Sequence, residues 1–173
     1  MENEVIKTLT ERRSVRRYIK KQVEEEKLEL ILKAGTYAPS GMGSQSPIMV
    51  VVQDPETISL LSRLNAVAMG SSGDPFYGAP TVVIVLADKN MWTCVEDGSL
   101  VMGNLMNAAF SLGVDSCWIH RAKEVFETKE GKELLKKWGI GENYIGVGNC
   151  ILGYRDGALP SARMRKNNYI YRV

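Results

Sequence analysis

The sequence contains a single histidine, His120, and three cysteines with no Cys-x-x-Cys pair among them. A zinc site would have to draw its other ligands from carboxylates and cysteines that lack the usual ligand spacing. A Ser-His-Asp triad would have only one candidate base, and the carboxylates lie mostly in helical charge runs such as 24–26 rather than in a glycosidase-type pair. We therefore predict no metal site and no catalytic residue supplied by the protein itself.

Glycine motifs for nucleotide binding are also missing. The Gly-x-Gly stretches at 139–141 and 146–148 lack the third glycine and the following helix of a dinucleotide fingerprint, and no Gly-Lys-Ser/Thr occurs. The longest apolar-rich run, 100–112, is too short and too polar to cross a bilayer, so we expect no membrane partner. Chemistry carried by a bound cofactor, which the protein only binds and orients, fits these absences.

Length and composition favour one globular domain. The chain has 173 residues, of which 45% are hydrophobic and 24% charged, and neither an internal repeat nor a linker divides it. We predict a single domain over residues 1–173. The start of the sequence shows no signal peptide, and the cysteines are odd in number and widely spaced, which is typical of reduced thiols and predicts a cytoplasmic protein.

Periodicity and capping signals predict the secondary structure. Apolar residues recur at helical spacing in 24–35, and Asp54-Pro55 is a helix start for a segment reaching about Met69. A long helix over 97–112 is apolar on most sides, so either its own sheet or a second subunit must cover it. Further short helices are expected at 5–9, 123–128 and 130–138, and buried strands at 48–52, 81–87, 116–119 and 146–154. This loose alternation, with an extended basic tail from residue 159, indicates a mixed α+β layer.

Cations and a hydroxyl are concentrated in the stretch 12–16. Ser14 and Arg16 are two residues apart, so in an extended segment they share a face, and Arg13 points the other way. Guanidinium groups and hydroxyls are the groups that hold a phosphate. A solvated basic turn is the alternative interpretation of such a cluster.

The run Arg12-Arg13-Ser14-Val15-Arg16-Arg17-Tyr18, followed by Ala38-Pro39-Ser40-Gly41-Met42-Gly43-Ser44-Gln45 and a hydrophobic strand, resembles the start of the FMN-dependent nitroreductase family. Gly78-Ala79-Pro80, Asn104-Leu105, and the segments 113–119 and 152–154 follow in the family's order, so the resemblance covers almost the whole chain. It implies an α+β fold, a three-layer α/β/α sandwich with a mixed, mainly antiparallel sheet. It also implies a homodimer with FMN at the subunit interface.

The resemblance further implies which residues bind the flavin. Arg12 and Ser14 are similar to the family's phosphate and ribityl contacts, with Arg13 beside them, and Arg16 to the basic residue at the pyrimidine end of the ring. The other residues that it implies are Pro39, Ser40 and Gly41, which cover the partner's flavin, with Gln45 following; Asn65 at the ring; Trp118, Ile119, His120 and Arg121 near flavin N5; and Arg163, with Arg165 and Lys166 as rivals, at the phosphate.

The activity implied is that of an NAD(P)H-dependent FMN oxidoreductase. Hydride would pass through flavin N5 to an electron-poor small molecule, a nitroaromatic, quinone or flavin, by a ping-pong mechanism, with NADH or NADPH as the donor. One alternative is a flavin carrier or specialised reductive enzyme on the same fold. Another is a nucleic-acid-binding module that tracks phosphates with 12–17 and 163–166, although a net charge of only +2 counts against it, and we expect no nucleic-acid partner.

Overall fold

The structure, a computed structural model, describes residues 3–173, so the first two residues of the domain predicted over 1–173 lie outside it. In chain order the elements are α1 (Glu4–Glu11), α2 (Glu25–Thr36), the 3-10 turn η1 (Gly41–Gly43), β1 (Pro47–Val52), α3 (Pro55–Met69), β2 (Thr81–Asp88), α4 (Cys94–Ser111), β3 (Asp115–Ile119), α5 (Ala122–Glu127), α6 (Lys129–Lys137) and β4 (Tyr144–Gly153).

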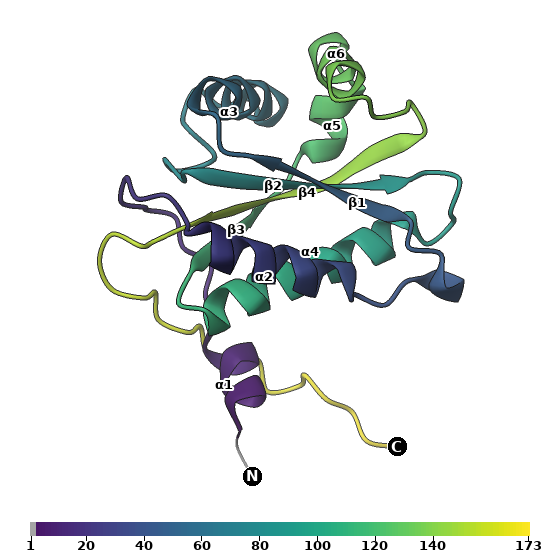
Figure 1. Cartoon of the computed structure of the whole chain (residues 1–173). Coiled ribbons are helices and arrows are strands. Elements are labelled where there is room, and N and C mark those ends of the chain that lie inside the picture. The colour runs from purple at the N-terminus through teal and green to yellow at the C-terminus, as the bar shows by residue number, and fades with distance from the viewer. Residues whose placement is uncertain (1–2) are drawn as a thin grey trace.

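The strands form one sheet in the order β1-β2-β4-β3, and all its ladders are antiparallel. Helices α2 and α4 cover one face of the sheet, and α3, α5 and α6 cover the other (Figure 1). Within residues 3–173, parallel pairing is limited to an isolated bridge between Ser14 and Ser116. The α+β fold, with three layers and a mainly antiparallel sheet, is therefore confirmed.

Strand β2 lies inside the sheet and is buried on both faces, as its continuous apolar run predicts. Val82, Ile84 and Leu86 face the core under α3 and α5, whereas Val83, Val85 and Ala87 face the core under α2 and α4. This alternation with a period of two follows from the pleat of a strand. Both cores are therefore built on the same central strand.

Local signals account for most helix ends. The Asp54 carboxylate accepts a hydrogen bond from the backbone N–H of Thr57 (2.8 Å), and Pro55 opens α3. Gly113, with φ +72°, follows the end of α4. Helix α4 begins at Cys94 rather than at Asp97, because the Asp97 N–H already donates to the carbonyl of Thr93 (2.8 Å). Asp97 therefore lies within the first turn.

The strand order places two segments predicted to form the binding site at opposite edges of the sheet. The Pro39–Gln45 loop leads into β1 at one edge, and the segment that contains Arg12 and Arg16 lies outside β3 at the other. Three strand spacings separate the edges, about 14 Å. Among the described residues, no helix has the length and apolar character needed to cross a membrane.

Candidate active site

The segment after α1 runs along the outer edge of β3. The backbone N–H of Val15 donates to the carbonyl of Ser116 (3.0 Å), beside the bridge between Ser14 and Ser116. Farther along, the Tyr18 hydroxyl donates to the carbonyl of Val15 (2.9 Å), and the residue itself pairs with the chain that follows β4. These bonds hold residues 12–18, here termed the strap, against the edge of the sheet.

Three of the predicted site residues in the strap lie close enough to the buried thiol of Cys117 on β3 to influence its pKa. Burial raises the pKa of this thiol, while Arg16, the hydroxyl of Ser14 and Arg12 act in the opposite direction. The structure thus brings Arg12, Ser14 and Arg16 together. Arg13 turns away, because its Nη1 donates to two carbonyls at the end of α1 (2.7 and 2.8 Å).

Within residues 3–173, four buried side-chain nitrogen and oxygen atoms have no hydrogen-bond partner. Arg12 Nη1 lies in the strap, and Ser116 Oγ and Trp118 Nε1 lie on β3. The fourth atom, Asn65 Oδ1, belongs to a residue on α3 that contacts the chain just after β3. An unpaired buried polar atom costs about 1–3 kcal/mol, so native proteins pair nearly all of them. Side chains alternate along a strand, so Ser116 and Trp118 project toward α4, whereas Asn65 lies on the α3 side. A polar ligand at the β3 edge is therefore suited to the unpaired atoms of Arg12 and Asn65.

The turn after β3 joins α3 to the same region. Asn65, only 1% exposed, donates from Nδ2 to the carbonyl of His120 (2.9 Å), while the His120 side chain is exposed. Arg121 has a left-handed backbone with φ +77°, and its guanidinium pairs with Glu124 (2.6 Å), which lowers the pKa of that carboxyl. Asn65, Ile119 and His120 therefore meet at the end of β3.

The remaining predicted site residues lie apart from the strap within one chain. Trp118 packs into the core beneath α4, with its indole against Gly148. The loop with Pro39, Ser40, Gly41 and Gln45 lies at the β1 edge, where the Ser40 hydroxyl accepts from the Gln45 N–H (2.9 Å). In the exposed tail, the Arg165 guanidinium folds back onto the carbonyl of Arg163 (2.6 and 3.1 Å), and Lys166 lies over the Tyr169 ring.

Asp97, which the sequence did not mark as a site residue, organises the loop at the β1 edge. It is 2% exposed, and its carboxylate accepts four hydrogen bonds, from Gly41 N–H (2.8 Å), Ser46 Oγ (2.7 Å), Thr93 Oγ1 (3.1 Å) and Ser44 Oγ (3.4 Å). Helical periodicity places Asp97 at the start of the long helix predicted over 97–112. Its main partners are more than fifty residues away in sequence, so no local pattern could have identified this role.

Comparison with known proteins identifies the protein family to which the chain belongs. The family model described as "Nitroreductase family" matches residues 9–73, which include the strap and the Pro39–Gln45 loop. A protein of Archaeoglobus fulgidus with a provisional name as an NADH dehydrogenase/NAD(P)H nitroreductase is 32% identical over 158 residues, covering 87% of this chain and 85% of its own length. The chain therefore belongs to the nitroreductase family.

Two further relatives carry names that mention flavin. A nitroreductase of Bacteroides fragilis, solved with bound FMN, has a TM-score of 0.92 and 33% identity, covering 99% of this chain and 100% of its own. The FMN reductase [NAD(P)H] of Bacillus subtilis is 37% identical over 89 residues, which cover 51% of this chain and 33% of the reductase. The similarity to the Bacteroides fragilis protein extends over the whole fold. The similarity to the Bacillus subtilis reductase extends over about half of this chain.

We expect Asp97→Asn to lower the free energy of unfolding by about 2 kcal/mol at pH 7, because charge-assisted bonds to buried donors are lost. Burial raises the pKa of Asp97, but the hydrogen bonds from Gly41, Ser46 and Thr93 outweigh it and leave the pKa below its usual value. The stabilisation is thus present above the pKa of the unfolded chain and is lost as the pH falls through the pKa of the folded state. Urea denaturation at several pH values measures this.

The control for this prediction is Asp156→Asn, which removes an exposed carboxylate paired with Arg17 (2.9 Å). We expect it to change the free energy of unfolding by no more than about 0.5 kcal/mol. The gap between Asp97→Asn and the wild type should narrow as the solution becomes acidic. A gap that stays constant with pH would show that the ionised carboxylate of Asp97 does not stabilise the loop.

Proposed function

We propose that the chain is an FMN-dependent oxidoreductase that takes hydride from NAD(P)H and reduces an electron-poor small molecule by a ping-pong mechanism. The observation that carries the proposal is that two buried polar atoms at the β3 edge, Arg12 Nη1 and Asn65 Oδ1, have no hydrogen-bond partner within residues 3–173. The relatives from Bacteroides fragilis and Bacillus subtilis, whose names mention FMN, also support it. We further propose that residues 1–173 act as a single domain.

The residues at the β3 edge fit FMN chemically. Arg12 offers a buried guanidinium nitrogen that lacks an acceptor, and Ser14 a hydroxyl beside it, which suits a phosphate and the polyol next to it. Asn65 Oδ1 is a free acceptor for a ring N–H, while its Nδ2 is already engaged by His120. These contacts are proposals, as are the other predicted ones, which include Arg13 and the tail cations Arg163 and Arg165.

When bound, FMN supplies a hydride acceptor at N5 and can pass its electrons on to a second substrate. The role of this chain is to bind and to stabilise charge. Arg16 is exposed at the edge of the site. Its guanidinium would stabilise the negative charge that reduction creates on the flavin. His120 and Arg121 follow the end of β3, and we propose that the donor and the acceptor reach the flavin from this side.

We also propose that the enzyme is a homodimer. None of the residues of α1 is buried, although Val5, Ile6 and Leu9 form an apolar side, and an isolated helix of two turns is unstable in water. The tail exposes Tyr169, Ile170 and Tyr171, and Figure 1 shows α1 and the tail projecting from the same side of the molecule. A second copy would cover both segments.

A two-fold dimer would also bring together the two halves of the site. The Pro39–Gln45 loop and the strap lie at opposite edges of one sheet, so a flavin bound at the strap would meet this loop from the partner subunit. Free, buried Cys94, Cys117 and Cys150 are consistent with a reducing compartment, and we propose that it is the cytoplasm.

We expect light scattering at micromolar protein to give the mass of two chains, and Leu9→Asp to shift the protein to monomer with loss of FMN. The reason is that a carboxylate on the apolar side of α1 would have to be desolvated in the interface. Lys7→Asp is the control, since it places the same group on the opposite, exposed side of α1. A wild-type monomer that holds FMN tightly would contradict the dimer.

The direct test of the proposed function is the visible spectrum of the purified protein. We expect a yellow protein that bleaches anaerobically with NADH or NADPH and regains its colour with a nitroaromatic or a quinone. Steady-state rates at varied donor and acceptor should give parallel double-reciprocal lines, because both substrates use one site. Colour without bleaching would favour a flavin carrier, and intersecting lines would require a second substrate site.

A further inference from the structure

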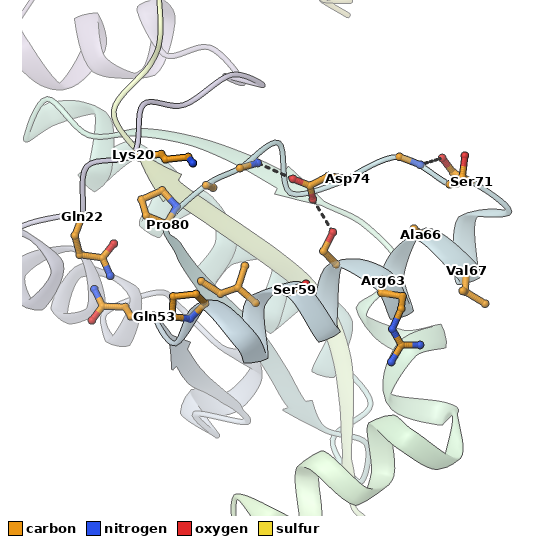
Figure 2. A pocket seen from close by; sticks show the side chains of 17 residues that line it. Lys20, Gln22, Gln53, Ser59, Arg63, Ala66, Val67, Ser71, Asp74 and Pro80 are labelled. Carbon is orange, nitrogen blue, oxygen red and sulfur yellow. Dashed lines mark hydrogen bonds between the residues drawn. The ribbon is translucent and has the colours of Figure 1, made fainter.

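A large cavity lies along α3. It is a groove of about 970 Å³ between α3 and the 71–80 loop, and Lys20 and Gln22 form its far wall (Figure 2). Its volume is in the range of sites that bind drug-sized ligands. None of its lining residues belongs to the flavin-contact set. We term it the α3 groove.

The wall of the α3 groove is held in place by its own hydrogen bonds. Asp74 accepts from the Ser62 hydroxyl (2.6 Å) and from the N–H groups of Phe76 (2.8 Å) and Gly78 (2.7 Å). The Phe76 side chain is buried in the core, and the Ser71 N–H donates to the carbonyl of Ala66 (2.9 Å). The loop is therefore anchored at both ends and in the middle, so the groove is preformed.

The charge of the α3 groove favours an anion. Asp74 is the only carboxylate among its lining residues, and the three bonds described above occupy both of its oxygens. Lys20 and Arg63 also line the groove, and in the described part of the chain neither forms an ion pair. Hydroxyls of Ser59 and Ser72 lie among them. Guanidinium, ammonium and hydroxyl groups together suit phosphates.

One end of the α3 groove lies next to the predicted flavin site. Ala66 lines the groove, and the preceding residue, Asn65, holds the carbonyl of His120. From Ala66 the groove follows α3 back to Pro55, a helix length of roughly 16 Å. Figure 2 shows Arg63 near Ala66 and Val67, and Lys20 toward the other end beside Pro80. The two cations are therefore spread along the groove.

From this arrangement we propose that the α3 groove binds the adenosine diphosphate part of the nicotinamide donor and selects NADPH over NADH. Arg63, nearer the flavin end, binds the pyrophosphate, and Lys20, at the far end, binds the 2′-phosphate that only NADPH carries. The inference rests on the proposed function, since it requires the nicotinamide to lie at the β3 edge. It goes beyond that function by assigning a separate site to the remote half of the donor.

The experiment titrates the FMN-loaded protein with 2′,5′-ADP and with 5′-ADP by calorimetry, and measures KM for NADPH and for NADH. We expect Lys20→Ala to raise the Kd of 2′,5′-ADP and the KM for NADPH about tenfold, the loss of one charge-assisted contact, with little change for 5′-ADP and NADH. Arg63→Ala should raise the KM for both donors. Lys132→Ala, an exposed lysine on α6, is the control and should change none of these values.

Wild-type Kd and KM values in both Lys20→Ala and Arg63→Ala would overturn the proposal and leave the proposed function intact. Equal losses for NADPH and NADH in Lys20→Ala would overturn the assignment of the 2′-phosphate. The titration with 2′,5′-ADP does not depend on hydride transfer. If neither donor bleached the flavin, the proposed function would fail, yet Lys20-dependent binding of 2′,5′-ADP would still support a nucleotide site in the groove.

Discussion

Replacing Arg12 with alanine is expected to weaken FMN binding by about ten- to a hundred-fold, which corresponds to the loss of a charge-assisted hydrogen bond of about 1.5–3 kcal/mol. The reason is the position of the guanidinium, which the strap holds beside Ser14 with Nη1 buried and unpaired in the described chain. Fluorescence titration of the FMN-free protein measures the affinity directly.

Arg17→Ala is the matched control, since it removes the same group five positions later in the sequence. The Arg17 side chain is 74% exposed and pairs with Asp156 at the surface, so its loss should change the affinity for FMN less than about threefold. Equal effects of the two substitutions would show that the faces of the strap are assigned wrongly. Thermal unfolding of both variants without FMN separates loss of binding from loss of folding.

A large effect on the fold is expected from Gly146→Ala, with a loss of about 3 kcal/mol in the free energy of unfolding. A Cβ on Gly146 would overlap the backbone of Ala122 and Lys123, at the start of α5. Backbone atoms cannot turn aside as a flexible side chain can, so α5 and the His120–Arg121 turn must shift. Urea denaturation should show a lower midpoint, and the FMN affinity should fall with it.

Gly73→Ala provides the comparison, because its added methyl group would meet only the Ser71 hydroxyl at 3.8 Å. We expect it to stay within about 0.5 kcal/mol of the wild type or to be slightly more stable, since alanine restricts the unfolded chain. If Gly146→Ala proved as stable as Gly73→Ala, α5 would not be packed against β4 as closely as the structure describes.

The helices and strands were predictable where the signal is local. Asp54 and Pro55 mark the start of α3, and Gly113 the end of α4, through preferences that act within one turn of the chain. The continuous apolar run of β2 likewise predicted a strand buried on both faces. The family resemblance supplied the sandwich architecture, which these local signals do not contain.

Features that depend on distant partners were not predictable in this way. Asp97 and Gly41 are 56 residues apart, so helical periodicity could place Asp97 on α4 but not reveal that it anchors the loop before β1. The α3 groove forms between a helix and a loop whose shape depends on Asp74 reaching back to Ser62. The contacts assumed between the flavin and Arg13, Pro39 or Arg163 stay predictions. The side chain of Arg13 turns away toward α1, and Pro39 and Arg163 lie apart from the strap within one chain.

The position of β4 has a consequence for how the protein forms during synthesis. The last strand made by the ribosome lies between β2 and β3, so β3 has no ladder partner until β4 has emerged. The strap cannot dock on the sheet before β4 has emerged, because its bridge partner Ser116 is not yet held in place. Closing a contact across about a hundred residues carries an entropic cost that only the completed sheet offsets. A nascent chain arrested before Tyr144 would therefore have no cofactor site at all, rather than a weakened one.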